Sequence, residues 1–284
     1  MSQEARMLLD VLELEPIELN LFRGRNEDRD GRLFGGQVLA QALRAAANTV
    51  EDRAPHSLHG YFMRPGDPRH AVLYEVERIR DGSSFTTRRV VAIQQGCAIF
   101  NMDVSFQIDE AGLSHEIAMP NVARPDQLED DVERARRLAD SNPHISPWAR
   151  RPRPFETRSV FPLGEARAAR DAFWNPVWIR FRAPIGDAAS LGHCLLAYAS
   201  DMGMVSTAAL PHGHAAPRAD IQMASLDHAL WYHRSFAVDE WLLMVKRTTS
   251  ANSSRGMNHA EFFDQHGRLI ASASQEGLMR VVKA

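Results

Sequence analysis

Apolar residues recur along the chain with two periods, and these periods predict its secondary structure. After Gly35-Gly36 they fall three and four positions apart and mark one face of a helix, at Val38, Leu39, Ala42, Leu43 and Ala46. Alternation of apolar and polar residues predicts strands over 17–23, 56–64, 71–80, 86–94 and 98–108. A short helix over 7–14, which ends before Pro16, precedes this series.

The segment from residue 120 to residue 158 differs in composition from the rest of the chain. It holds a charged, helix-like stretch over 127–139, and several prolines follow between residues 143 and 154. A charge run of this kind is most simply a solvated helix face. We therefore expect an N-terminal unit over 1–120, a linker with a charged helix over 121–154, and a C-terminal unit over 155–284.

The first pattern returns after this linker. Residues 34–40 resemble residues 191–197, at an offset of 157 (191 − 34), and Ser57-Leu58-His59 resembles Ser225-Leu226-Asp227, at an offset of 168 (225 − 57). Each half therefore reads as a strand, a long apolar helix and several antiparallel strands, and such self-similarity indicates a repeated unit. The predicted fold class is α+β: two tandem hot-dog units, each an antiparallel β-sheet wrapped around a central helix.

Composition narrows the function classes. The 284 residues carry a net charge of −3 and only two cysteines, Cys97 and Cys194, so nucleic-acid binding and a disulfide framework are not expected. No stretch of about 18 uncharged apolar residues is present, so no membrane span is expected. The start of the chain does not have the pattern of a signal peptide. We expect a cytoplasmic protein.

Asp201 is the residue in the second apolar helix that most needs an explanation. A carboxylate on such a helix is expensive to bury without hydrogen-bond partners, and perturbed carboxylates are enriched at functional sites. The matching position in the first half is Arg44, so only the second half keeps an acid here. The alternative is an aspartate that caps a backbone break near Gly203, or one that faces solvent.

Long ordered motifs carry a resemblance to a known family. They include Leu196–Asp201, Ser225–Arg234, Ser253–Gly256 and Gln275–Arg280 in the second half, and Tyr61–Asp67 in the first. These motifs look like those of the acyl-CoA thioesterase II (TesB-type) family, and the match spans residues 5–281. The resemblance implies hydrolysis of fatty acyl-CoA to free fatty acid and CoA, with acyl-CoA as the partner molecule, no cofactor and no metal. It also implies a homo-oligomer, a dimer or a tetramer.

The same resemblance implies a catalytic set in the C-terminal unit. Carried over by motif position, Asp201 would activate a water that Ser225 and Gln275 hold in place. Ser225 departs from the threonine that the family usually has, although its hydroxyl can still donate to or accept from water.

Several further residues are candidates for substrate binding. Backbone N–H groups at a glycine-rich helix start, Gly35-Gly36 or Gly192-His193, are natural donors to an oxyanion. His59 could line the site or polarise the carbonyl, and Arg88 and Arg255 could meet the phosphates of CoA. Their ordinary interpretations are a hydrogen-bonded structural histidine and solvated surface arginines.

Two other functions compete with thioester hydrolysis. A hot-dog hydratase or dehydratase would need a histidine–aspartate arrangement on the central helix, which the pattern does not indicate. A non-catalytic acyl-CoA-binding protein would tolerate Ser225 without difficulty. A Gly-x-Ser-x-Gly elbow is absent from the sequence, which argues against a serine nucleophile of the α/β-hydrolase kind.

Overall fold

The computed structural model describes residues 1–26, 31–141, 145, 147–162, 168, 171, 173–186, 188–213 and 221–282. Its helices are α1 (Gln3–Leu12), α2 (Gly35–Ala47), α3 (Asp131–Ala139), α4 (Ala189–Ser200) and α5 (Met204–Thr207), with short 3-10 helices η1 (Pro125–Gln127), η2 (Pro147–Arg150) and η4 (Leu210–His212). The first-half strands are β1 (Glu15–Glu18), β2 (Leu21–Gly24), β3 (Ala54–Phe62), β4 (Val72–Asp81), β5 (Phe85–Gln94) and β6 (Cys97–Gln107). The second-half strands are β7 (Phe155–Ser159), β8 (Trp174–Phe181), β9 (Ile221–Ser225), β10 (Asp227–Tyr232), β11 (Leu242–Asn252), β12 (Arg255–Asp264) and β13 (Leu269–Val281).

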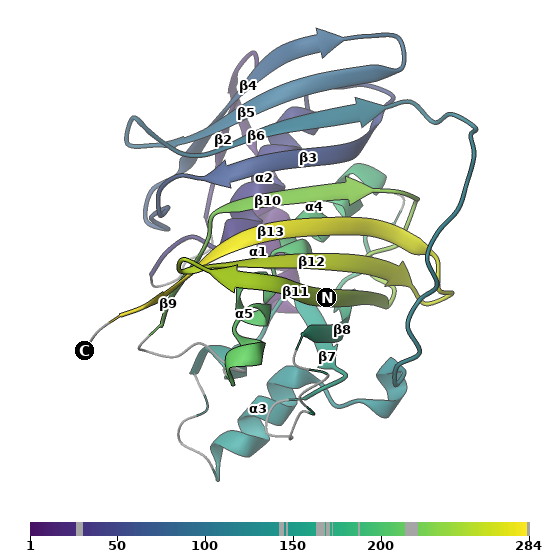
Figure 1. Cartoon of the computed structure of the whole chain (residues 1–284). Helices are drawn as coiled ribbons and strands as arrows, with labels where there is room; N and C mark the ends of the chain where they lie inside the picture. The colour runs from purple at the N-terminus through teal and green to yellow at the C-terminus, as the bar shows by residue number, and fades with distance from the viewer. Residues whose placement is uncertain are drawn as a thin grey trace.

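In the described part of the chain, the strands form one antiparallel sheet in the order β1-β2-β4-β5-β6-β3-β10-β13-β12-β11-β8-β7, with β9 added on β13. The two halves repeat the same order outward from the centre, where β3 pairs with β10. Figure 1 shows this continuous, curved sheet with the first half above the second. The two units therefore share one sheet, and their internal repeat is visible strand by strand.

Helices α2 and α4 lie side by side behind the sheet (Figure 1) and pack against each other. Each is buried along most of its length, and most of its buried residues are small or apolar. A helix with so much buried apolar surface has to be covered on more than one side, here by the sheet and by the partner helix. The expected arrangement of a sheet around a central helix is thus confirmed in both halves.

Most predicted elements agree with the structure to within a few residues. One prediction is wrong: residues 17–23 form a hairpin of β1 and β2 rather than a single strand, because the chain turns at Asn20, whose φ of 64° lies in the left-handed region. The charged helix begins at Asp131, after η1, because Asp130 caps it by accepting from the N–H groups of Val132 and Glu133. Part of the predicted linker, residues 142–144 and 146, lies outside the described residues.

The second half has an insertion between its central helix and β10. Helix α5, η4 and β9 stand where the first half has only the short connection from α2 to β3. Within the described residues, no helix is both long and apolar enough to cross a membrane. The boundaries at residues 120 and 154 stay predictions.

Candidate active site

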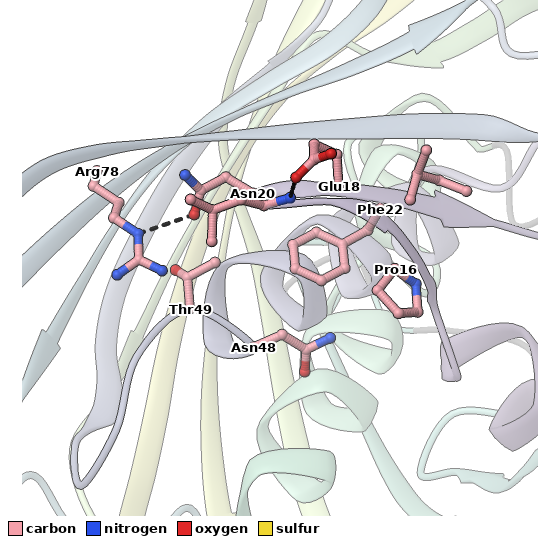
Figure 2. Close-up of a pocket in the computed structure, with 9 residues that line it drawn as sticks. Pro16, Glu18, Asn20, Phe22, Asn48, Thr49 and Arg78 are labelled. Atoms are coloured by element: carbon pink, nitrogen blue, oxygen red, sulfur yellow. Dashed lines mark hydrogen bonds between the residues drawn. The ribbon is translucent and has the colours of Figure 1, made fainter.

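Two hollows differ in the chemistry of their walls. The smaller, of about 350 Å³, is lined by Arg78, Asn20 and neighbouring residues of β1, β2 and the end of α2, and in Figure 2 Arg78 already donates to Asn20. The larger, of about 650 Å³, is lined by Asp201, Ser225 and Gly35 together with many apolar side chains. Only the larger hollow brings a buried acid to a mainly apolar cavity, which makes it the candidate site.

Asp201 enters this cavity because α4 ends there. It is the C-cap of α4, and Gly203, with a φ of 70°, takes the left-handed conformation that stops the helix. Lys246 donates to the carbonyl of Met202 in the same turn. The aspartate does lie at a backbone break near Gly203, as the alternative interpretation held, yet its side chain points inward and the residue is only 7% exposed.

Three donors from three different elements converge on the Asp201 carboxylate. The Gly36 N–H, at the start of α2, donates to Oδ2 at 2.9 Å. The Ser225 hydroxyl donates to Oδ1 at 3.1 Å, and the Gln275 amide Nε2 donates to the same oxygen at 2.6 Å. Burial raises the pKa of Asp201 to about 6, whereas the hydrogen bonds from Gln275, Ser225 and Gly36 each act to lower it. The carboxyl is therefore ionised at neutral pH and is still a stronger base than an exposed aspartate.

A local irregularity lets Ser225 reach the same cavity as the inward side chains of β10. The five residues from Ser225 to Ala229 lie opposite only four residues of β13, from Gly277 to Ser274. The extra residue is a bulge, which reverses the inside–outside alternation along the strand. Ser225 and His228, three positions apart, consequently both face the interior hydrogen-bond network.

The two glycines at the start of α2 leave room for the carboxylate. A Cβ on Gly35 would lie 2.9 Å from Asp201 Oδ2, and one on Gly36 would lie 2.4 Å from the Tyr198 carbonyl oxygen of α4. The acid of the second half therefore lies directly against the helix start of the first half. The Gly36 N–H, however, is engaged by the acid itself, and the Gly192 N–H donates to the Ala188 carbonyl, so neither has the predicted role of free oxyanion donor.

Comparison with known proteins decides the family. A family model described as "Acyl-CoA thioesterase" matches residues 164–278, and one described as "Acyl-CoA thioesterase N-terminal domain" matches residues 24–107. "Acyl-CoA thioesterase 2" of Haemophilus influenzae is 35% identical over 283 residues, which are 99% of this chain and 99% of that protein. The chain belongs to the acyl-CoA thioesterase family.

Solved structures agree with this assignment. An acyl-CoA thioesterase II of Mycobacterium marinum is 39% identical and superposes with a TM-score of 0.80, over 96% of this chain and 98% of that one. A protein of Alicyclobacillus acidocaldarius described as having a hot-dog fold is 19% identical, with a TM-score of 0.75, over 98% of this chain and 99% of that one, and shows the fold alone. The predicted family and double hot-dog fold are thus confirmed.

Three predicted substrate-binding residues of this thioesterase do not lie in the cavity. Arg88 is 1% exposed and ion-paired with Asp81, because β5 turns it toward the core; its assignment to CoA phosphates is wrong. His59 faces outward from β3, with its ring 5.1 Å from that of Trp231, and cannot polarise a carbonyl in the cavity. Arg255 is exposed and paired with Glu276, and it does not line the hollow.

Beside the predicted Gln275, the site of this thioesterase also contains buried polar residues that were not predicted. One row of inward positions crosses six strands, passing from apolar to polar at the centre of the sheet: Val90, Met102, Gly60, His228, Gln275 and Asn258. The polar members all belong to the second half, and Ser200 of α4 contacts His228. Only the alternation of His228 with apolar Leu230 and Tyr232 could have indicated from sequence that its side chain points inward.

We predict that Gly35→Ala lowers kcat by roughly tenfold or more, because the new methyl group would displace the Asp201 carboxylate from its donors. Gly192 is the matching position of α4, where an added Cβ would meet only Ile185, at 3.4 Å. Gly192→Ala is therefore the matched control, with unchanged kcat and unchanged or higher thermal stability. Equal rates for the two variants in a thioesterase assay would show that Gly35 is not needed for this close approach.

Proposed function

We propose that this chain hydrolyses fatty acyl-CoA to free fatty acid and CoA, with Asp201 as the general base. One observation carries the proposal: a carboxylate with a pKa of about 6 lies in the wall of a mainly apolar cavity, held by Ser225 and Gln275. A base with a pKa near the working pH is the kind that general-base catalysis requires. The named activity of the relatives supports the same reaction.

The steps follow from the donors and acceptors at the site. Water gives one proton to the Asp201 carboxylate while its oxygen forms a bond to the thioester carbonyl carbon. Ser225 and Gln275, as neighbours of the carboxylate, orient this water. The tetrahedral intermediate then breaks its carbon–sulfur bond, and the CoA thiolate leaves with the proton that Asp201 took up. The carboxylate is regenerated, and no covalent enzyme intermediate forms.

The oxyanion needs a donor other than Gly36. The Gly35 N–H belongs to a residue that lines the cavity, and it donates to no acceptor of the described chain. As the first N–H of α2 it also lies at the positive end of the helix dipole. We assign it the oxyanion role, one residue before the position that holds the acid.

The two competing functions fit the site less well. A hydratase would need a histidine beside the acid on the central helix, but His193 lies in the first turns of α4 and contacts the Ala189 carbonyl, far along the helix from Asp201. A purely binding protein would have no use for a buried ionised carboxylate, because burying the charge costs fold stability and such groups are enriched at reactive sites. The homo-oligomeric state and the cytoplasmic setting stay predictions.

Asp201→Asn tests the base directly. We expect kcat to fall by roughly 10²-fold or more, because an amide cannot accept the proton of water. In the unaltered protein, kcat/KM should fall as the pH drops below about 6, where Asp201 becomes protonated. Both are measured from the loss of thioester absorbance with a panel of acyl-CoAs. Asp227→Asn is the control and should leave kcat unchanged. Asp227 is a carboxylate on β10 that accepts from the Glu276 N–H. Near-normal turnover by Asp201→Asn would remove the residue from the mechanism.

We propose Arg32 and Arg64 as the phosphate contacts of CoA, in place of Arg88 and Arg255. Both line the cavity, and among the described residues neither is ion-paired with a carboxylate. Their segments run side by side, since the Leu33 N–H donates to the Gly66 carbonyl at 2.9 Å. Arg64 uses one Nη1 bond to hold the Ala98 carbonyl and keeps its other N–H groups. Among the described residues that line the cavity, Asp201 is the only acid, so Arg32 and Arg64 give this part of the rim a positive charge that attracts anions.

Replacing both arginines by alanine should raise KM for acyl-CoA by roughly tenfold or more and leave kcat nearly unchanged, because charge-assisted bonds to phosphate would be lost far from the reacting carbonyl. Hydrolysis of the matching acyl-pantetheine thioester, which lacks the nucleotide, should be unaffected. Arg255→Ala is the control and should behave normally with both substrates. Equal effects on the two substrates would contradict a phosphate contact.

A further inference from the structure

A buried chain of hydrogen bonds leads from α4 to the proposed base. The Ser200 hydroxyl donates to the Ala197 carbonyl at 2.8 Å, and its oxygen lies 2.8 Å from His228 Nε2. On the other side of the ring, His228 Nδ1 lies 3.0 Å from Gln275 Nε2, which in turn donates to Asp201 at 2.6 Å. Ser200, His228 and Gln275 are completely or almost completely buried. The reaction steps above use Gln275 and Asp201 but leave Ser200 and His228 without a role.

The proton positions in this chain follow from its donors and acceptors. Ser200 has one hydroxyl proton, which it gives to Ala197, so its oxygen can only accept from His228. The His228 ring therefore carries its proton on Nε2. Burial lowers the pKa of His228 to about 3, which keeps the ring neutral and leaves a lone pair on Nδ1. That lone pair faces the Gln275 amide and requires a donor there.

The Gln275 amide is otherwise free to turn. Its oxygen, Oε1, is buried and has no hydrogen-bond partner in the described protein, so only the contacts of Nε2 decide which end faces Asp201. Turned by half a rotation, Oε1 would face both an anionic carboxylate and the lone pair of Nδ1. The Asp201 carboxylate and His228 Nδ1 are thus two acceptors that together select one orientation of the amide. Asp201 takes up a proton during the reaction, whereas Nδ1 of His228 stays an acceptor throughout.

We propose that His228 is a positioning residue, which holds the Gln275 amide with its NH₂ group toward Asp201 and has its own tautomer set by Ser200. This inference rests on the proposed hydrolysis at Asp201. It explains why the inward position of β10 is polar, although the residue directly opposite on β3 is Gly60. A misplaced amide would no longer donate to Asp201, whose pKa the Gln275 bond lowers, and would no longer orient water.

Two variants of similar polarity separate the contacts of His228. In His228→Asn, an amide oxygen can stand near the position of Nδ1 and accept from Gln275; in His228→Gln, the amide reaches toward Ser200, and the Nδ1 acceptor is lost. We expect His228→Gln to lower kcat roughly tenfold or more with little change in KM. Its kcat/KM profile should also lose activity at a higher pH than the unaltered protein. His228→Asn should restore most of both properties. Identical pH profiles for the two variants and the unaltered protein would overturn the proposal.

Action through Gln275 is tested by combining changes. In a Gln275→Ala background, His228→Gln should reduce kcat no further, whereas multiplied losses would show that His228 does not act through the amide. Nitrogen NMR of the unaltered protein does not depend on any variant folding. It should show a neutral His228 with its proton on Nε2, and a proton on Nδ1 would overturn the proposal. Normal activity of Asp201→Asn would instead refute the hydrolysis mechanism itself.

Discussion

The structure depends on one carboxylate that is buried in an apolar interior and kept ionised by donors from separate elements. Burial alone would raise the pKa of Asp201 further, and exposure alone would leave it too weak a base. The N–H of Gly36, the hydroxyl of Ser225 and the amide of Gln275 limit the rise of its pKa to about 6. The acid lies where α4 ends and α2 begins. The positive N-terminal end of α2 therefore offsets part of the cost of burying the charge.

The two halves share a fold but not a site, and the sheet shows why. Across the central pair of β3 and β10, the same inward row changes from Val90, Met102 and Gly60 to His228, Gln275 and Asn258. The two central helices also differ in the charged residue at their ends. Helix α4 ends at Asp201, whereas the matching residue of α2 is Arg44, which reaches Ser190 near the start of α4. The first half thus supplies an apolar wall and the helix start, and the second half supplies the polar groups, so neither half would be a site by itself.

The sequence predicted most helices and strands well, but it predicted site residues only where a family motif indicated them. Apolar periodicity located the helix of Gly35 and the long strands, and the family resemblance selected Asp201, Ser225 and Gln275, which the structure brings into contact. The sequence-based prediction failed where the direction of a side chain decides whether the residue can reach the cavity. Arg88 and His59 follow plausible motifs, but strand alternation turns the first into the core and the second away from the cavity. The link between His228 and Ser225 was missed because the bulge after Ser225 brings two residues three positions apart to the same face, and a bulge cannot be seen without the register of β13.

The raised pKa of Asp201 also has a consequence for stability. An unfolded aspartate titrates near 3.8 and the folded one near 6, so the folded state binds the extra proton between these values. The contribution of that proton to the free energy of unfolding is fully present below pH 3.8 and is lost as the pH rises through about 6. At neutral pH the ionised form therefore costs the fold about 3 kcal/mol relative to an unperturbed aspartate. The packing of the rest of the fold must outweigh this cost, and the close contact of α2 with α4, at which the carboxylate lies, is part of that packing.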